Sequence, residues 1–84
     1  MSVEAMAWAI RQQLPAREKL ILFCLSDVAS SEGFLMPPIV VLEQKTGLGR
    51  VEINLSIKSL MDLDLIRKNE EIIDNRPVYQ MVMR

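Results

Sequence analysis

Hydrophobic positions along this chain follow a helical spacing before residue 62 and a spacing of two residues after it. Over residues 16–30, apolar side chains recur at intervals of three and four residues, which gives a helix a buried stripe. A second stripe, made of Ile53, Ile57 and Leu60, predicts a helix over residues 50–62. The period then changes to two, and residues 65–68 and 78–82 are predicted as strands.

Shorter elements and turns are predicted from glycine, proline and polar residues. Gly47 supplies the positive φ angle for a tight turn over residues 46–49. Before this turn we expect a short strand over residues 34–36 and a short helix over residues 39–45, with Pro38 in its first turn. Residues 69–77 contain turn formers and predict the long tip of a hairpin, and residues 3–13 predict a short helix or an arm.

The predicted fold class is α+β, with three core helices, a short strand and a C-terminal two-stranded hairpin. Two short helices joined by a glycine-containing turn are typical of a helix-turn-helix, and a hairpin after the second helix is a wing. The 84 residues suffice for one small domain, over residues 1–84. Within it we distinguish an N-terminal arm, a helix-turn-helix and a wing, at residues 1–14, 38–62 and 65–83.

Composition excludes several kinds of site. The chain has one cysteine and no histidine, so a disulfide framework, Cys/His zinc sites and histidine acid–base chemistry are excluded. Cys24 lies on an apolar stripe and is expected to be an inert core residue. We find no phosphate-binding loop or nucleophile–base set, and therefore predict no enzyme, no cofactor, no metal and no small-molecule substrate.

The cellular location is predicted from the absence of a membrane-spanning segment and of a signal peptide in the sequence. No apolar run is long enough to span a bilayer, and the first 14 residues do not have the layout of a signal peptide. A cytoplasmic protein without membrane contact is therefore expected. Ten basic residues stand against eleven acidic ones, a net charge of −1 that by itself gives no support to nucleic-acid binding.

The chain resembles the winged helix-turn-helix module of phage and plasmid replication proteins and related regulators. The resemblance covers essentially the whole sequence in order. It rests on Trp8-Ala9, Leu14-Pro15, Glu18-Lys19-Leu20, Leu25-Ser26-Asp27, Ala29, Gly33, Pro37, Leu42, Thr46-Gly47-Leu48, Ile53, Leu60 and Leu65-Ile66. It implies a winged-helix fold with a recognition helix over residues 49–62. It also implies binding of duplex DNA in replication initiation or control, with regulation of transcription as the nearest neighbour, and the chain as a possible fragment of a longer protein.

Candidate DNA contacts lie on the predicted recognition helix and wing. Arg50, Asn54 and Lys58 provide the donors that base edges and phosphates accept, on the side of the helix away from the stripe. The wing adds Arg67, Lys68 and Arg76. It also carries acidic residues, so a solvated hairpin competes there with a phosphate clamp.

The same helix face supports a second hypothesis. Family members often have a basic residue where Val51 and Leu55 stand, and these two side chains offer DNA at best contact with thymine methyl groups. The alternative function is a repurposed winged helix that acts as a protein–protein adaptor or inhibitor through the Val51/Leu55 face. The apolar pair Ile72-Ile73 is a further candidate contact. Trp8 is either a core residue or a dimer contact, and we expect a homodimer or a larger replication assembly.

Overall fold

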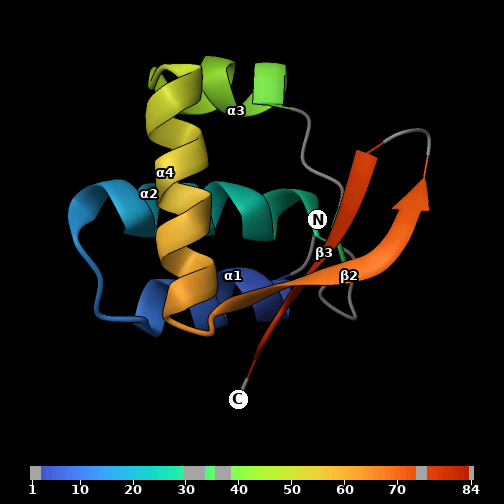
Figure 1. The fold of residues 1–84 in the computed structure, drawn as a ribbon. Coiled ribbons are helices and arrows are strands. Elements are labelled where there is room, and N and C mark those ends of the chain that lie inside the picture. Colours follow the sequence, from blue (N-terminus) through green and yellow to red (C-terminus); the bar gives the residue numbers. More distant parts are fainter. Residues whose placement is uncertain (1–2, 30–33, 36–38, 74–75, 84) are drawn as a thin grey trace.

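A computed structural model describes residues 3–29, 34–35, 39–73 and 76–83, with the backbone alone at 34, 35, 71 and 76 (Figure 1). These residues form an α+β fold with four helices and a three-stranded antiparallel sheet, which is compatible with the predicted winged helix. In chain order the elements are α1 (Val3–Arg11), α2 (Ala16–Val28), β1 (Phe34–Leu35), α3 (Ile39–Thr46), α4 (Arg50–Asp62), β2 (Ile66–Ile73) and β3 (Arg76–Met81).

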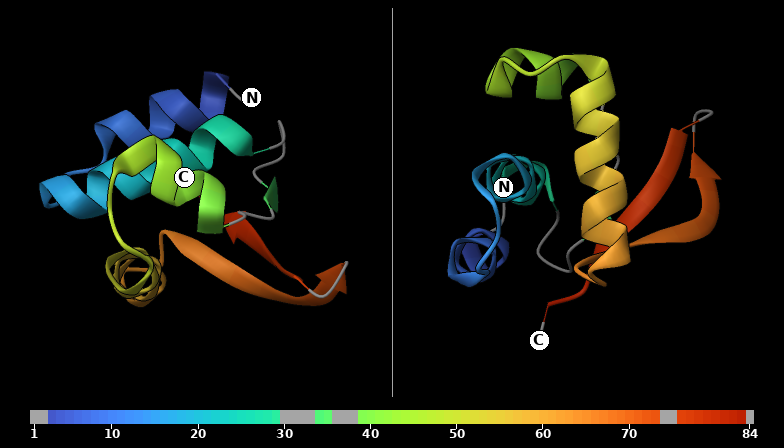
Figure 2. Two further views of the ribbon diagram at one scale, coloured as in Figure 1. Left: turned by 90° about the horizontal axis from the view of Figure 1, so that it is seen from above. Right: turned by 60° about the vertical axis from the view of Figure 1, so that its left-hand side comes forward.

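Helix α2 lies at the centre of the helical part and contacts α1, α3 and α4 (Figure 2). Its side chains Ile21, Leu22 and Leu25 are almost completely buried, because the helix is apolar nearly all round and has neighbours on several sides. The core is completed by residues from every other helix and from the hairpin, including Ala5, Trp8, Ala9, Leu42, Ile53, Ile57, Leu60, Ile66 and Met81.

The predicted arm is a helix that packs against α2. Its inward face consists of Ala5, Trp8 and Ala9, and Trp8 is only 4% exposed. Of the two interpretations of Trp8, the core position is confirmed, and it leaves little surface for the other, a dimer contact. The two alanines on this face are completely buried, and their small side chains take up little space between α1 and α2.

The sheet has the order β1-β3-β2, so β3 is central and pairs with both neighbours. Both strands of the hairpin are longer than predicted, and the loop expected over residues 69–77 is wrong, because β2 continues to Ile73 and β3 begins at Arg76. The pairing is irregular between Lys68 and Ile72, where β2 contains more residues than its partner strand. Such a bulge bends and twists a hairpin. The predicted turn residues Asp74 and Asn75 lie outside the described residues.

The two helices of the helix-turn-helix meet at the predicted turn. Gly47 has φ +75° and its N–H donates to the Glu43 carbonyl at 2.9 Å. The Thr46 hydroxyl donates to the Leu42 carbonyl and accepts from the Leu48 N–H, which ties the turn together. Helix α3 ends one residue later than predicted, and α4 has the predicted bounds. The predicted positions of Met36 and Pro38 lie outside the described residues.

One other boundary differs slightly. Helix α2 ends at Val28 and Ala29 is already extended, whereas the sequence predicted helix up to residue 30. Pro15 is the residue immediately before the first helical residue of α2. Among the helices in the described ranges, none is long and apolar enough to cross a membrane.

Candidate nucleic-acid interface

Helix α4 has one face inside the molecule and one face outside it. Ile53, Ile57 and Leu60 are buried against the rest of the core, as their spacing predicted. On the opposite side, Val51 is 73% exposed and Leu55 is 50% exposed. The helical phase inferred from the sequence is therefore confirmed.

The three polar candidates of α4 are all exposed, but they differ in what they contact. The guanidinium Nη2 of Arg50 lies 3.5 Å from Glu43 Oε1, which links α4 to the preceding helix α3. This is a long ion pair at the surface, and such pairs contribute little to stability. Among the described residues, no hydrogen bond or ion pair engages Asn54 or Lys58, so both side chains are available to a ligand.

Glu52 has a structural task at the start of α4. Its Oε1 accepts a hydrogen bond from the Gly49 N–H at 3.3 Å. Because glycine has no side chain, this contact forms only half of a capping box. A carboxylate in the first turn also stabilises the positive end of the helix dipole. The negative charge of Glu52 is thereby held at the helix start and beside the outer face, not at its centre.

The hairpin presents its two described cations on different faces. Arg67 pairs with Gln80 and Lys68 with Tyr79, and both basic side chains are exposed. Successive residues of a strand point to opposite faces of a sheet. Arg67 and Lys68 therefore cannot both lie on the hairpin face that would meet a DNA backbone. The backbone of Arg76 lies opposite Ile73, but its side chain is outside the described part of the structure.

The apolar pair Ile72-Ile73 belongs to β2 and not to a loop. The two residues pair with Pro77 and Arg76 near the end of the hairpin, and both side chains are exposed. Their strand position means that they also point to opposite faces. They do not form a single apolar patch of the kind that the sequence suggested.

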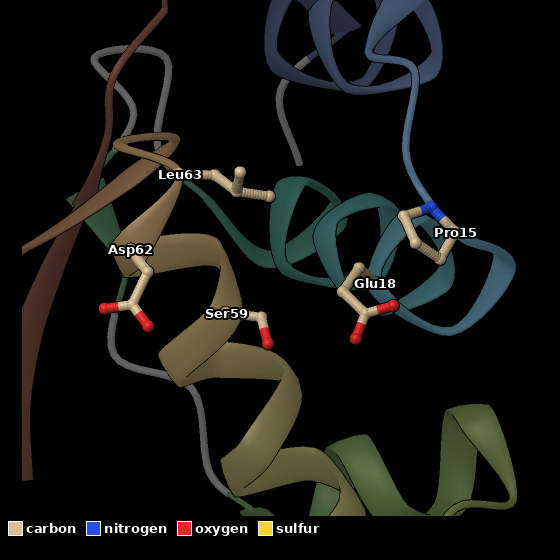
Figure 3. A pocket seen from close by; sticks show the side chains of 5 residues that line it. All are labelled: Pro15, Glu18, Ser59, Asp62 and Leu63. Atoms are coloured by element: carbon tan, nitrogen blue, oxygen red, sulfur yellow. The ribbon is translucent and has the colours of Figure 1, made fainter.

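A hollow of about 330 Å³ lies at the other end of α4 and was not predicted. Figure 3 shows the Glu18 carboxylate and the Ser59 hydroxyl on opposite sides of it, and Pro15, Asp62 and Leu63 complete the lining. Arg17 donates two hydrogen bonds to Glu18 Oε1, and this contact lowers the pKa of the carboxyl. The residues come from α2 and from the end of α4, far apart in sequence, so no motif could signal the hollow.

Two titratable groups, one in this region and one in the core, have shifted pKa values. The hydrogen bonds from Arg17 favour the charged form of the Glu18 carboxyl, which lowers its pKa. Burial raises the pKa of the Cys24 thiol, which keeps it protonated at neutral pH. No group of three or more His, Cys, Asp or Glu in the described ranges is placed to hold a metal ion.

Comparisons of the chain with family models, with curated proteins and with solved structures found no match. A function is therefore inferred from the sequence and from the geometry of the described residues.

Proposed function

We propose that this chain is a winged-helix module that binds duplex DNA, with α4 as the recognition helix and the β2–β3 hairpin as the wing. Its role would be replication initiation or control in a phage or plasmid, or regulation of transcription. The resemblance described above supports this assignment, as does the order of α3, turn, α4 and hairpin.

The observation that carries the proposal is the division of α4 into two faces. One face is anchored in the core, and the other exposes Asn54 and Lys58 with no intramolecular partner among the described residues. Helix α4 has 13 residues and is about 20 Å long, and the major groove of B-DNA, about 12 Å wide, admits such a helix. An unengaged amide and ammonium on an exposed helix are suited to base edges and phosphates.

The charge of the chain determines how strongly it is expected to bind DNA. With a net charge of −1 and few cations near α4, non-specific binding should be weak at physiological salt, with Kd near or above about 10⁻⁴ M. Binding to random duplex DNA should therefore be measured from low salt upward. The logarithm of the affinity should fall linearly with the logarithm of the salt concentration, because each neutralised phosphate releases counterions.

Variants test which cations take part. Lys58→Ala should weaken binding and reduce the salt slope by about one unit. Arg67→Ala and Lys68→Ala should differ from each other, because only one of the two lies on the DNA side of the hairpin. Arg11→Ala is the matched control, since it removes an exposed cation from α1, which packs on α2. If Lys58→Ala, Arg67→Ala and Lys68→Ala all bound DNA as tightly as the wild type, the proposed DNA interface on α4 and β2 would be contradicted.

A second function is favoured by the exposed pair Val51 and Leu55. A protein partner that covered both side chains would gain about 1.5–3 kcal/mol from each. Val51→Arg and Leu55→Arg separate the two functions, because the added charge strengthens non-specific DNA binding and disrupts an apolar protein contact. Neither substitution should lower the melting temperature much, since both positions are exposed.

The assembly proposed with this function is a homodimer or a part of a larger replication complex, because one small module contacts few base pairs. With Trp8 in the core, α1 still offers Val3 and Ile10, which are both exposed. Light scattering over a range of concentrations tests the dimer. A monomer mass throughout, including in the presence of DNA, would contradict it, and an Ile10→Glu variant that dimerises normally would place the contact elsewhere.

A further inference from the structure

Four side chains on the outer face of α4 form one continuous group. Val51 and Leu55 are four residues apart, and Asn54 and Lys58 are four residues apart, in parallel rows. Residues three or four apart on a helix are neighbours, so Val51 also adjoins Asn54, and Leu55 also adjoins Lys58. We call these four exposed residues the reading patch.

The reading patch combines an amide with two aliphatic side chains, and this combination matches one kind of base pair. In the major groove, an A·T pair presents the N7 acceptor and N6 donor of adenine, together with the 5-methyl group of thymine. An asparagine amide can bind both adenine groups at once, and aliphatic side chains contact the methyl group. A G·C pair has neither this donor and acceptor order nor a methyl group.

We infer that α4 reads A·T pairs, with Asn54 on adenine and with Val51 and Leu55 on thymine methyl groups. This inference rests on the proposed DNA-binding function and assigns its specificity. It gives a task to the two aliphatic residues that stand where the resemblance leads one to expect basic ones. Lys58 serves affinity for phosphate and not the choice of base.

The polar members of the patch favour DNA over a protein as its occupant. A protein surface that buried Val51 and Leu55 would also cover Asn54 and Lys58, which have no partner among the described residues. Burying an unpaired amide or ammonium is costly. DNA offers an adenine edge to Asn54 and a phosphate to Lys58 while the aliphatic side chains meet methyl groups.

The charge at the other end of α4 fixes which part of the helix enters the groove. Asp62 lies one turn beyond Lys58, and no basic residue lies in the last turn of the helix. A carboxylate there is repelled by phosphates, so contact is confined to the part of the helix from its start to Lys58. Recognition helices of this class also contact bases mainly with residues near their N-termini.

The test uses duplex pools made from one random-sequence library. One pool contains thymine, and a second contains uracil, which lacks only the 5-methyl group. Removing this group should weaken binding by about fourfold for one contacted methyl group and by about fifteenfold for two. A third pool with uracil and 5-methylcytosine returns a methyl group to the same side of the major groove, and should regain part of the affinity.

Variants connect the methyl effect to named residues. The double variant Val51→Ala with Leu55→Ala should bind the thymine and uracil pools equally and keep its salt dependence. Lys58→Ala should weaken binding to both pools by the same factor and keep their ratio. Val40→Ala is the matched control, because it truncates an exposed aliphatic side chain on α3 and should also keep the ratio.

The outcomes separate this inference from the function on which it rests. If no pool binds with salt dependence, the proposed DNA-binding function fails. If the wild type binds the thymine and uracil pools equally, methyl recognition is overturned and DNA binding stands. A methyl effect that survives in the double alanine variant, or that disappears in Val40→Ala, would also overturn the assignment of Val51 and Leu55.

Discussion

The two faces of α4 differ in what determines their residues. On the inner face, Ile53, Ile57 and Leu60 are fixed by packing against the core, and each contributes to stability through burial. On the outer face, Val51 and Leu55 have the same chemistry but are 73% and 50% exposed. Hydrophobic character alone therefore does not distinguish a core residue from a contact residue, and the helical phase does.

The largest effect expected from this comparison concerns two leucines of the same helix. Leu60→Ala should lower the free energy of unfolding by about 2–5 kcal/mol, because it leaves a cavity in a closely packed core. Leu55→Ala should lower it by about 1 kcal/mol or less, because this side chain is already half exposed in the folded protein. Urea unfolding of both variants measures the difference. Similar losses would mean that the outer face is buried in the folded protein, for example in an oligomer.

The inner face contains one polar position, and removing its hydroxyl should stabilise the protein. Ser56 is completely buried, and its Oγ has no hydrogen-bond partner among the described residues. Ser56→Ala removes this unsatisfied group and raises helix propensity, so the free energy of unfolding should rise by about 1–2 kcal/mol.

Ser26 on α2 is the matched control for this prediction. It is equally buried, but its hydroxyl donates to the Phe23 carbonyl. Ser26→Ala should therefore stabilise the protein less than Ser56→Ala, or destabilise it. Thermal unfolding of the two variants decides this, and the opposite order would show that Ser56 has a partner in solution.

The turn between the C-terminal end of α4 and the hairpin contains one residue with a strained backbone conformation. Asp64 has φ +60°, and the Asp64 and Leu65 N–H groups donate to the Met61 and Leu60 carbonyls, as in a Schellman motif. Both Asp64→Gly and Asp64→Ala remove the carboxylate, but only glycine adopts positive φ without strain. The glycine variant should be more stable than the alanine variant by about 1 kcal/mol in chemical unfolding. Equal stability would show that the turn relaxes to another conformation.

The smallest effect concerns the N-terminal end of α4. Gly49 has an ordinary φ of −77°, and a Cβ added there would meet only Glu52 Oε1, at 3.7 Å. Gly49→Ser should complete the capping box and raise the free energy of unfolding by a few tenths of a kcal/mol. Gly47→Ser, at φ +75°, should instead destabilise the protein. A loss of stability in Gly49→Ser would mean that the serine hydroxyl displaces Glu52 without replacing its contact.

Local patterns in the sequence determined most of the helical part. The bounds and phase of α4 follow from the spacing of Ile53, Ile57 and Leu60, because residues three or four positions apart lie on the same face of a helix. The turn at Gly47 follows from glycine, the residue type that adopts its positive φ angle without strain. The exposed positions of Asn54 and Lys58 then follow from the phase.

Tertiary structure decided whatever depends on residues far apart in sequence. The length of β2 depends on pairing with β3, so its polar central residues carry no local signal. Trp8 is apolar in either of its two interpretations, and only the position of α1 against α2 places it in the core. The predicted strand over residues 65–68 already places Arg67 and Lys68 on two faces, but only the pairing with β3 decides where each face lies in the fold. A sequence pattern records which side of an element is apolar, but the neighbour that covers that side is a property of the whole fold.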